Sequence, residues 1–258
     1  MIPIHSVTDQ ISYFNVPYKD IFVGIYVIRT EAGTVLFDTA GCAADIDTYI
    51  LPALEQLKTT PSCIFISHNH LDHAGGLARA MECFPNAVLF SRSTSLKETY
   101  PMLCYPSDGD LICDVLQVVT IPGHTADAMA LLDRRTNTLI SGDCLQAYGI
   151  FGSGYWYSNI TLPVEHLEAI RKLRSFPLEI LATAHDYHPH GMVIYGQKAC
   201  TQYLDSCTCA LTRLHEQLCA QPLLTDEQIA DLCNDGSLPK VSPRVINALR
   251  SLSIHQFE

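Results

Sequence analysis

Three histidines and an aspartate fall within six positions, from His68 to His73, directly after the apolar run 63–66. A buried strand that runs into a short polar loop displays such side chains together at the edge of a sheet. Imidazole nitrogens and carboxylate oxygens are the ligands that borderline metals such as zinc prefer. A single histidine would suit an ordinary polar loop, but four ligand-type side chains at this spacing predict a metal site at the end of a strand.

The same arrangement recurs along the chain, because further predicted strands are each followed by a polar loop with a histidine or an aspartate. His124 follows the predicted strand 116–121, Asp143 follows 138–140, and His185 follows 179–182. Layered α/β proteins assemble sites from ligands at several strand ends in this way. We therefore expect sheets flanked by helices, with the metal loops along one edge.

Apolar spacing and turn residues predict the remaining elements. A hairpin is expected at 21–28 and 34–37, where Glu31-Ala32-Gly33 forms the turn. From Gly196 onward the pattern is mostly helical, with a capping box at Thr225 and Gln228. The other predicted strands are 63–66, 87–90 and 128–132, and the other predicted helices are 43–57, 76–83, 163–176 and 244–252.

Composition restricts the class of protein. The chain has 258 residues, which suits one large domain or one domain with an appendage. It is 48% hydrophobic and 17% charged, as expected of a globular protein, and its net charge of -11 opposes nucleic-acid binding. No secretory leader or membrane span is expected. The eleven cysteines are expected to be reduced, mostly as buried apolar residues, in a cytoplasmic protein.

With these loops in order, the chain resembles the metallo-β-lactamase superfamily of hydrolases. The matching segments are His-x-His-x-Asp-His at 68–73, Pro-Gly-His-Thr at 122–125, Ser-Gly-Asp at 141–143 and Ala-His-Asp at 184–186. The resemblance implies an α/β fold, an αββα sandwich of two mixed β-sheets flanked by helices. It implies a catalytic domain over 1–195, and residues 196–258 are expected to form a helical extension packed on it.

The resemblance also implies a dinuclear metal site. One metal would be held by His68, His70 and His124, and the second by Asp72, His73 and His185, with Asp143 bridging both. Two Zn²⁺ ions are expected, although iron or manganese fits the same ligand types. Two such cations would activate a bridging hydroxide for hydrolysis of a small-molecule ester, thioester or lactone. We expect Asp72 to relay a proton to the leaving group.

Other interpretations of single residues remain open. His124, Asp143 and His185 could each be an ordinary turn or strand-end residue if taken alone. Asp38 is expected to orient a ligand rather than bind metal. His188 and His190 suit surface or hydrogen-bonded positions, or contacts to substrate. The aromatic and glycine-rich segment 148–159 suits either core packing or a mobile loop over the metals.

The substrate class is also left open by the resemblance. Asp143 argues against a true β-lactamase, because those members lack a bridging aspartate. Thioesterases like glyoxalase II and lactonases fit the ligand set, whereas a phosphodiesterase, a redox di-iron enzyme and a non-catalytic metal-binding module are the alternatives. Neither the small-molecule substrate nor the oligomeric state follows from the sequence.

Overall fold

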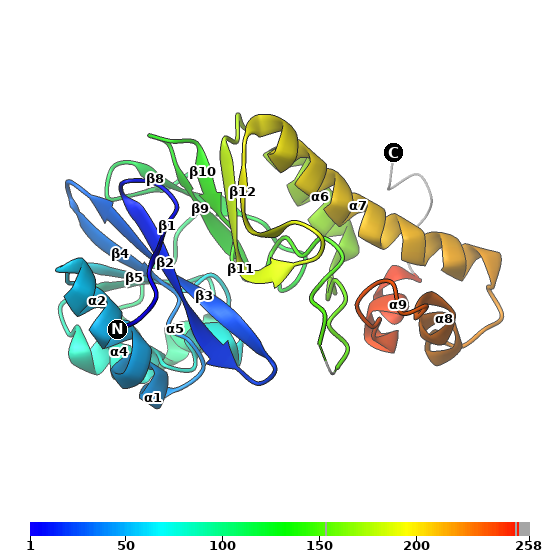
Figure 1. Cartoon of the computed structure of the whole chain (residues 1–258), viewed down its shortest axis with the longest axis horizontal. Helices are drawn as coiled ribbons and strands as arrows, with labels where there is room; N and C mark the ends of the chain where they lie inside the picture. Colours follow the sequence, from blue (N-terminus) through cyan, green and yellow to red (C-terminus); the bar gives the residue numbers. More distant parts are fainter. Residues whose placement is uncertain (153, 251, 253–258) are drawn as a thin grey trace. The chain divides into compact units, whose positions relative to one another are not determined.

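The computed structural model describes residues 1–152, 154–250 and 252 (Figure 1). These residues form two mixed β-sheets with flanking helices, which confirms the predicted fold class. The chain divides into two compact units. Unit 1 comprises Met1–Val119 with Leu131–Arg134, and unit 2 comprises Thr120–Ala130 with Arg135–Glu258.

The first sheet lies wholly in unit 1, with the strand order β1-β2-β3-β4-β5-β6. Its first four strands pair antiparallel, and β4, β5 and β6 pair in parallel. The predicted hairpin is present as β3 and β4. The strands are β1 His5–Ser6, β2 Ile11–Tyr18, β3 Ile21–Thr30, β4 Gly33–Phe37, β5 Cys63–Phe65 and β6 Val88–Phe90.

β2 was not predicted from the sequence. It pairs with β3 along its whole length and buries Ile11, Phe14 and Val16 completely. Pro17 and Asn15 interrupt its strand signal, because proline donates no ladder hydrogen bond and asparagine is rare in strands. Packing of the apolar side chains on β3 overrides these local preferences.

Both helices predicted in unit 1, over 43–57 and 76–83, are present, whereas α3 and α5 were not predicted. The predicted helix over 43–57 is present as three consecutive helical segments, the middle one being a π-helical turn. Figure 1 shows α1, α2 and α4 in blue to cyan colours beside the strands of the first sheet. The segments are α1 Ala43–Asp45, η1 Ile46–Ile50, α2 Leu51–Leu57, α3 Leu71–Ala74, α4 Leu77–Cys83 and α5 Thr94–Thr99.

The second sheet has the strand order β12-β11-β10-β9-β8-β7. Its strands are β7 Leu111–Ile112, β8 Leu116–Thr120, β9 Met129–Asp133, β10 Thr138–Ile140, β11 Ile180–Tyr187 and β12 Gly191–Tyr195. The predicted strands around 116, 128 and 138 are confirmed. The prediction for β11 was too short: the strand continues to Tyr187, so His185 lies within it rather than in a following loop. The return strand β12 was not predicted.

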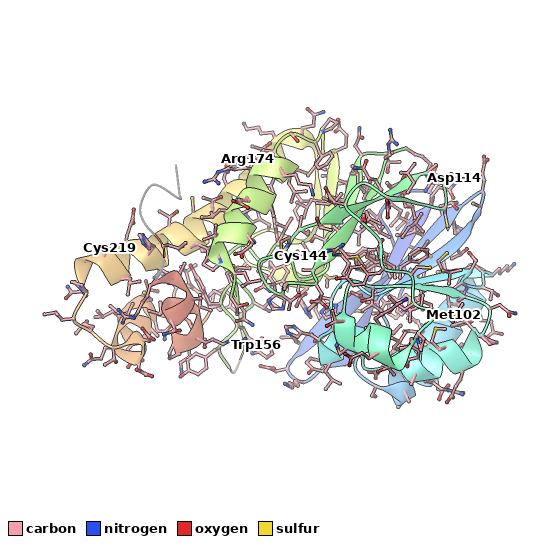
Figure 2. The ribbon with its side chains drawn as sticks, turned by 180° about the vertical axis from the view of Figure 1, so that it is seen from behind. Met102, Asp114, Cys144, Trp156, Arg174 and Cys219 are labelled. Carbon is pink, nitrogen blue, oxygen red and sulfur yellow. The ribbon has the colours of Figure 1, made fainter. Side chains whose placement is uncertain are left out.

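Unit 2 also carries α6 Pro163–Leu173, α7 Gln197–Ala220, α8 Asp226–Cys233 and α9 Pro243–Leu249. The capping box at Thr225 and Gln228 is present at the start of α8, as predicted. Arg174, labelled in Figure 2, caps the C-terminal end of α6. Its guanidinium pairs with Asp205 of α7 at 2.7 Å. The 24-residue α7 thus lies against α6 at one end and reaches α8 and α9 at the other.

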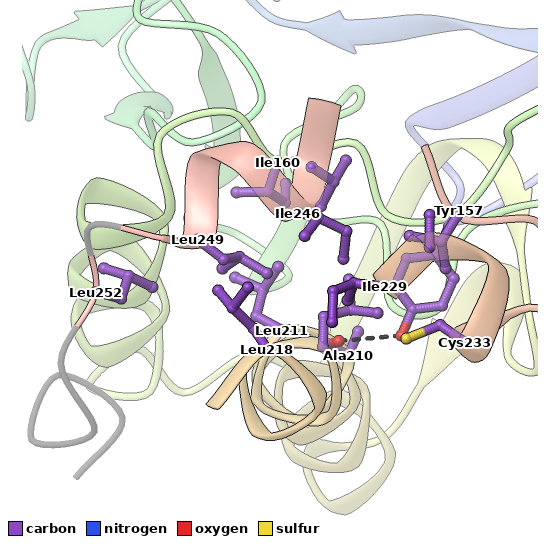
Figure 3. Close-up of a cluster of buried hydrophobic side chains, with 14 residues drawn as sticks. Tyr157, Ile160, Ala210, Leu211, Leu218, Ile229, Cys233, Ile246, Leu249 and Leu252 are labelled. Carbon is purple, nitrogen blue, oxygen red and sulfur yellow. Dashed lines mark hydrogen bonds between the residues drawn. The ribbon is translucent and has the colours of Figure 1, made fainter. Parts of the chain in front are cut away.

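Apolar side chains of α7, α8 and α9 form one buried cluster with the segment that precedes α6 (Figure 3). Tyr157 lies within it and donates its phenolic hydrogen bond to the Ala210 carbonyl over 3.0 Å. Tyr157 therefore packs in a core. The domain boundary after residue 195 stays a prediction.

The cysteines differ from the expectation of mostly buried thiols. Five are buried, whereas Cys42, Cys104, Cys209 and Cys219 are exposed. All eleven are free thiols in the structure. Among the described residues, no helix is both long and apolar enough to cross a bilayer.

Candidate metal centre

In unit 1, the cluster of ligand-type side chains follows the buried strand β5. The loop after Phe65 turns into the single-turn helix α3, which brings His70, Asp72 and His73 close in space to His68. His68 and His73 are fully buried. Each of the four side chains offers a ligand atom for a metal ion.

His68 and His70 face each other through their ring nitrogens. His68 Nε2 lies 3.0 Å from His70 Nδ1, and Ser67 Oγ lies 3.1 Å from His68 Nδ1. Two imidazole nitrogens bound to one tetrahedral zinc ion at normal bond lengths lie about 3.3 Å apart. The spacing of this pair therefore fits two ligands of a single metal.

Asp38 fixes the loop that follows β5 through contacts with Ser67 and His73. It follows β4 in a left-handed conformation, with φ of 65°, and it is fully buried. Its carboxylate accepts hydrogen bonds from the Ser67 backbone (2.7 Å) and the Ser67 hydroxyl (2.9 Å), and lies 2.7 Å from His73 Nδ1. Nδ1–H donation to Asp38 directs Nε2 of His73 outward as a ligand atom, the orienting role that we expected.

The environment of Asp38 combines opposing electrostatic effects. Burial raises the pKa of its carboxyl group above the ordinary value, whereas His73 and the Ser67 hydrogen bonds lower it. Asp72 lies on the other side of the His73 ring, with Oδ2 3.6 Å from Nε2. One imidazole thus lies between two carboxylates, an environment that suits a bound cation.

In unit 2, three ligand-type residues converge from separate strand ends. Asp143 follows β10, His185 lies within β11, and His124 precedes β9. One oxygen of Asp143 lies 3.2 Å from His185 Nε2, and the other lies 3.8 Å from His124 Nε2. The two carboxylate oxygens therefore face two different imidazoles.

Neighbouring residues orient these three side chains. His124 Nδ1 donates to the Asn159 carbonyl over 2.7 Å, which leaves Nε2 directed at Asp143. The Tyr187 hydroxyl donates to Asp143 Oδ1 over 2.9 Å. Gln146 accepts from the Asn159 backbone and donates to the Asp143 carbonyl. Such partners fix the histidine tautomer and raise ligand basicity.

These supporting residues were not predicted from the sequence. Tyr187 could have been found, because it lies two positions after His185 on one strand and so shares its face. Asn159 and Gln146 carry no such signal, since Asn159 lies 35 positions after His124, with β9 and β10 between them, and contributes only a backbone carbonyl.

A buried histidine that received no role lies beneath the His124 turn. His166 of α6 is 1% exposed, and neither of its ring nitrogens has a hydrogen-bond partner among the described residues. Burial, with a smaller effect from His124, lowers its pKa to about 3. A Cβ at Gly123 would come within 2.8 Å of the His166 ring, so only glycine fits at that position of the turn.

The remaining candidates lie along the segment after β10 and the β11–β12 turn. His190 shares a 2.8 Å hydrogen bond with Ser206, and His188 contacts the Phe151 ring edge-on. Phe151 and Tyr155 are exposed, in contrast to the buried Tyr157. Core packing therefore explains one end of the aromatic segment only, and Ser153 lies outside the described residues.

Comparisons with known proteins agree with the fold and the family that the sequence motifs indicate. The family model described as "Metallo-beta-lactamase superfamily" matches residues 20–185. "Uncharacterized protein YobT" of Bacillus subtilis (strain 168) is 30% identical over 153 residues, which are 49% of this chain and 64% of that protein. The chain thus matches just under two thirds of this relative's length.

A second relative and a solved structure cover more of the chain. Hydroxyacylglutathione hydrolase of Xanthomonas axonopodis pv. citri (strain 306) is 26% identical over 217 residues, 78% of this chain and 80% of that protein. The structure of a metallo-beta-lactamase from Pontibacter korlensis has a TM-score of 0.61 at 18% identity, covering 80% of this chain and 99% of that one. At this identity the structural likeness concerns the fold.

Proposed function

Because the chain belongs to the metallo-β-lactamase superfamily, we propose that it is a hydrolase with two divalent metal ions, most simply Zn²⁺. In this proposal His68, His70 and His124 hold one ion, and Asp72, His73 and His185 hold the other. Asp143 bridges the two. The imidazole and carboxylate groups of both units are the ligand types that zinc accepts.

The observation that carries the proposal is the position of Asp143. Its two carboxylate oxygens face His185 and His124 separately, and Tyr187 holds one of these oxygens in place. A carboxylate whose two oxygens face different histidines can be shared by two ions, each held by one of those histidines. This geometry supports a site for two ions rather than one.

When bound, two divalent cations lower the pKa of a shared water and so supply hydroxide at neutral pH. The chain's own residues then have separate tasks. Asp38 keeps His73 in the tautomer that presents Nε2. Asp72, beside His73, is the group that would carry a proton to the departing oxygen or sulfur.

For the substrate we propose a small-molecule thioester, ester or lactone, with the thioester preferred. The support is the relative named hydroxyacylglutathione hydrolase, which aligns with 78% of the chain. We also propose that the protein works in a reducing compartment such as the cytoplasm, because all eleven cysteines are free thiols.

A substrate panel tests the proposal. Zinc-loaded protein is incubated with a thioester, a lactone, an aryl ester and an aryl phosphodiester, with and without chelator. We expect chelator-sensitive hydrolysis, fastest with the thioester. Turnover of the phosphodiester alone would replace the proposal with a phosphodiesterase, and inert metal-loaded protein would leave a metal-binding module.

Asp72→Asn separates the catalytic assignment from the ligand assignment. Asparagine keeps an oxygen ligand but carries no proton to a leaving group. With metal content retained, we expect a lower kcat and a loss that is largest for leaving groups of high pKa. Unchanged turnover at full metal occupancy would exclude Asp72 as the proton carrier.

A further inference from the structure

Two cysteines of unit 1 that lie 50 positions apart in the chain meet in space. Cys63 Sγ is 3.8 Å from Cys113 Sγ. A disulfide bond has a sulfur–sulfur distance of about 2.05 Å, so the gap to be closed is roughly 1.8 Å. Neither residue belongs to the metal-ligand set proposed above.

Different kinds of backbone hold the two thiols. Cys63 is the first residue of β5 and pairs with Val35 and Val88 on the neighbouring strands. Cys113 lies in the turn between β7 and β8, where it and Asp114 both adopt positive φ angles of 49° and 63°. A turn adjusts more readily than a strand with partners on both sides, so we expect Cys113 to make the movement.

The two thiols also differ in reactivity. Cys63 is buried, whereas Cys113 is partly exposed. Hydrogen bonding from Cys63, aided by Thr30, lowers the pKa of Cys113 to about 7, and the same contact together with burial raises the pKa of Cys63. Near neutral pH Cys113 is therefore the thiolate that a small disulfide can reach, and Cys63 is the protonated partner behind it.

We propose that Cys63 and Cys113 are a redox pair that closes reversibly to an intramolecular disulfide on reaction with a low-molecular-weight disulfide such as oxidised glutathione. The Cys113 thiolate attacks one glutathione sulfur, forms a mixed disulfide and releases one glutathione thiolate. Cys63 then gives its proton to that thiolate and attacks the Cys113 sulfur, which releases the second glutathione. The protein loses two electrons, and oxidised glutathione gains them.

The new bond would enclose the segment that carries the metal loop. β5 begins at Cys63 and leads into the loop with His68, and the hydrogen bond from the Ile66 backbone to the Phe90 carbonyl lies within the same closed segment. Closing a loop of this length restricts the unfolded chain, so the oxidised protein should unfold at a higher temperature than the reduced protein.

Thiol trapping in glutathione buffers tests the proposal. Wild type, Cys63→Ser, Cys113→Ser and the exposed-cysteine control Cys209→Ser are equilibrated at several ratios of oxidised to reduced glutathione. The samples are quenched with N-ethylmaleimide and mapped by peptide mass spectrometry. Wild type and the control should show a Cys63–Cys113 linked peptide that reducing buffer removes, together with a raised unfolding temperature.

The single variants distinguish the order of the two steps. Cys63→Ser should stop at a glutathione adduct on Cys113, whereas Cys113→Ser should leave Cys63 unmodified. The proposal is overturned if wild-type Cys63 and Cys113 are both alkylated at the most oxidising ratio, or if Cys113 links to Cys104 instead. Because wild type alone decides these outcomes, a variant that folds poorly does not weaken the test.

Discussion

The two units present their ligand-type residues in different ways. Unit 1 has four within six positions of a single loop, whereas unit 2 collects three from separate strand ends between residues 124 and 185. The dense loop indicates metal binding by itself. The three dispersed residues indicate a metal site only when their order in the chain and the fold are considered together. In unit 2 the fold places Asp143 Oδ1 3.2 Å from His185 Nε2.

The groups that orient the ligand-type residues also differ between the two units. A buried carboxylate, Asp38, orients the histidine of unit 1. In unit 2 the Asn159 carbonyl and the Tyr187 hydroxyl, which are neutral groups, orient His124 and Asp143. Removal of the Asp38 carboxylate leaves three buried groups without their acceptor, whereas removal of the Tyr187 hydroxyl takes one donor from Asp143, so mutations of the two sets should have unequal effects.

The largest effect is expected from Asp143→Asn, because it removes the charge of the proposed bridging ligand without changing its size. We expect metal content to fall and kcat/KM to drop by more than about 100-fold. Elemental analysis and thioester hydrolysis measure the two effects. Asp186→Asn changes an exposed carboxylate that directly follows His185 on the same strand; it is the matched control and should behave as wild type.

Asp38→Ala is expected to come next. It leaves the Ser67 groups and His73 Nδ1 buried without their acceptor, which should weaken metal binding by about 10- to 100-fold and lower the free energy of unfolding by about 3 kcal/mol. Chelator competition and denaturant unfolding check both values. If this variant bound metal as tightly as wild type, Asp38 would not be the group that orients His73 for metal binding.

Tyr187→Phe tests the hydrogen bond that orients Asp143 in unit 2. It removes one hydrogen bond to the Asp143 carboxylate while the ring stays in place, so a loss of about 1.5 kcal/mol is expected. In chelator competition this is a weakening of about tenfold. If Tyr187→Phe weakened metal binding more than Asp38→Ala, the proposed order of these two effects on metal affinity would be wrong.

The smallest effect at neutral pH is expected from His166→Leu. Burial keeps the folded-state pKa of His166 at about 3, below the unfolded value of about 6.5. As the pH falls through this window the unfolded chain takes up a proton that the folded chain does not, so wild type loses up to about 1.4 kcal/mol per pH unit. Urea unfolding between pH 7 and about pH 4 should show a shallower loss for the variant, and equal slopes would contradict this assignment.

The sequence predicted most elements because strong periodicity and turn residues agreed with the final packing. β2 was missed because Asn15 and Pro17 weaken its local signal, although β3 pairs with it throughout. His185 was placed after a strand that in fact includes it. Local propensity does not report on the pairing partner that extends a strand.

The residues of the candidate metal centre were likewise only partly predictable from local sequence signals. The dense motif and the role of Asp38 followed from ligand chemistry, but Asn159 and the neutral His166 depend on how α6 and the preceding segment pack against the His124 turn. Contacts made over such sequence separations depend on tertiary structure, and no pattern in the residues themselves marks them.

Titration of metal-free protein with Zn²⁺, with thioester hydrolysis followed at each step, tests the central claim most directly. If the seven proposed ligands hold two ions, activity should rise to a plateau at about two equivalents per chain and should not develop in Asp143→Asn. A plateau at about one equivalent, or full metal loading without hydrolysis, would contradict the account.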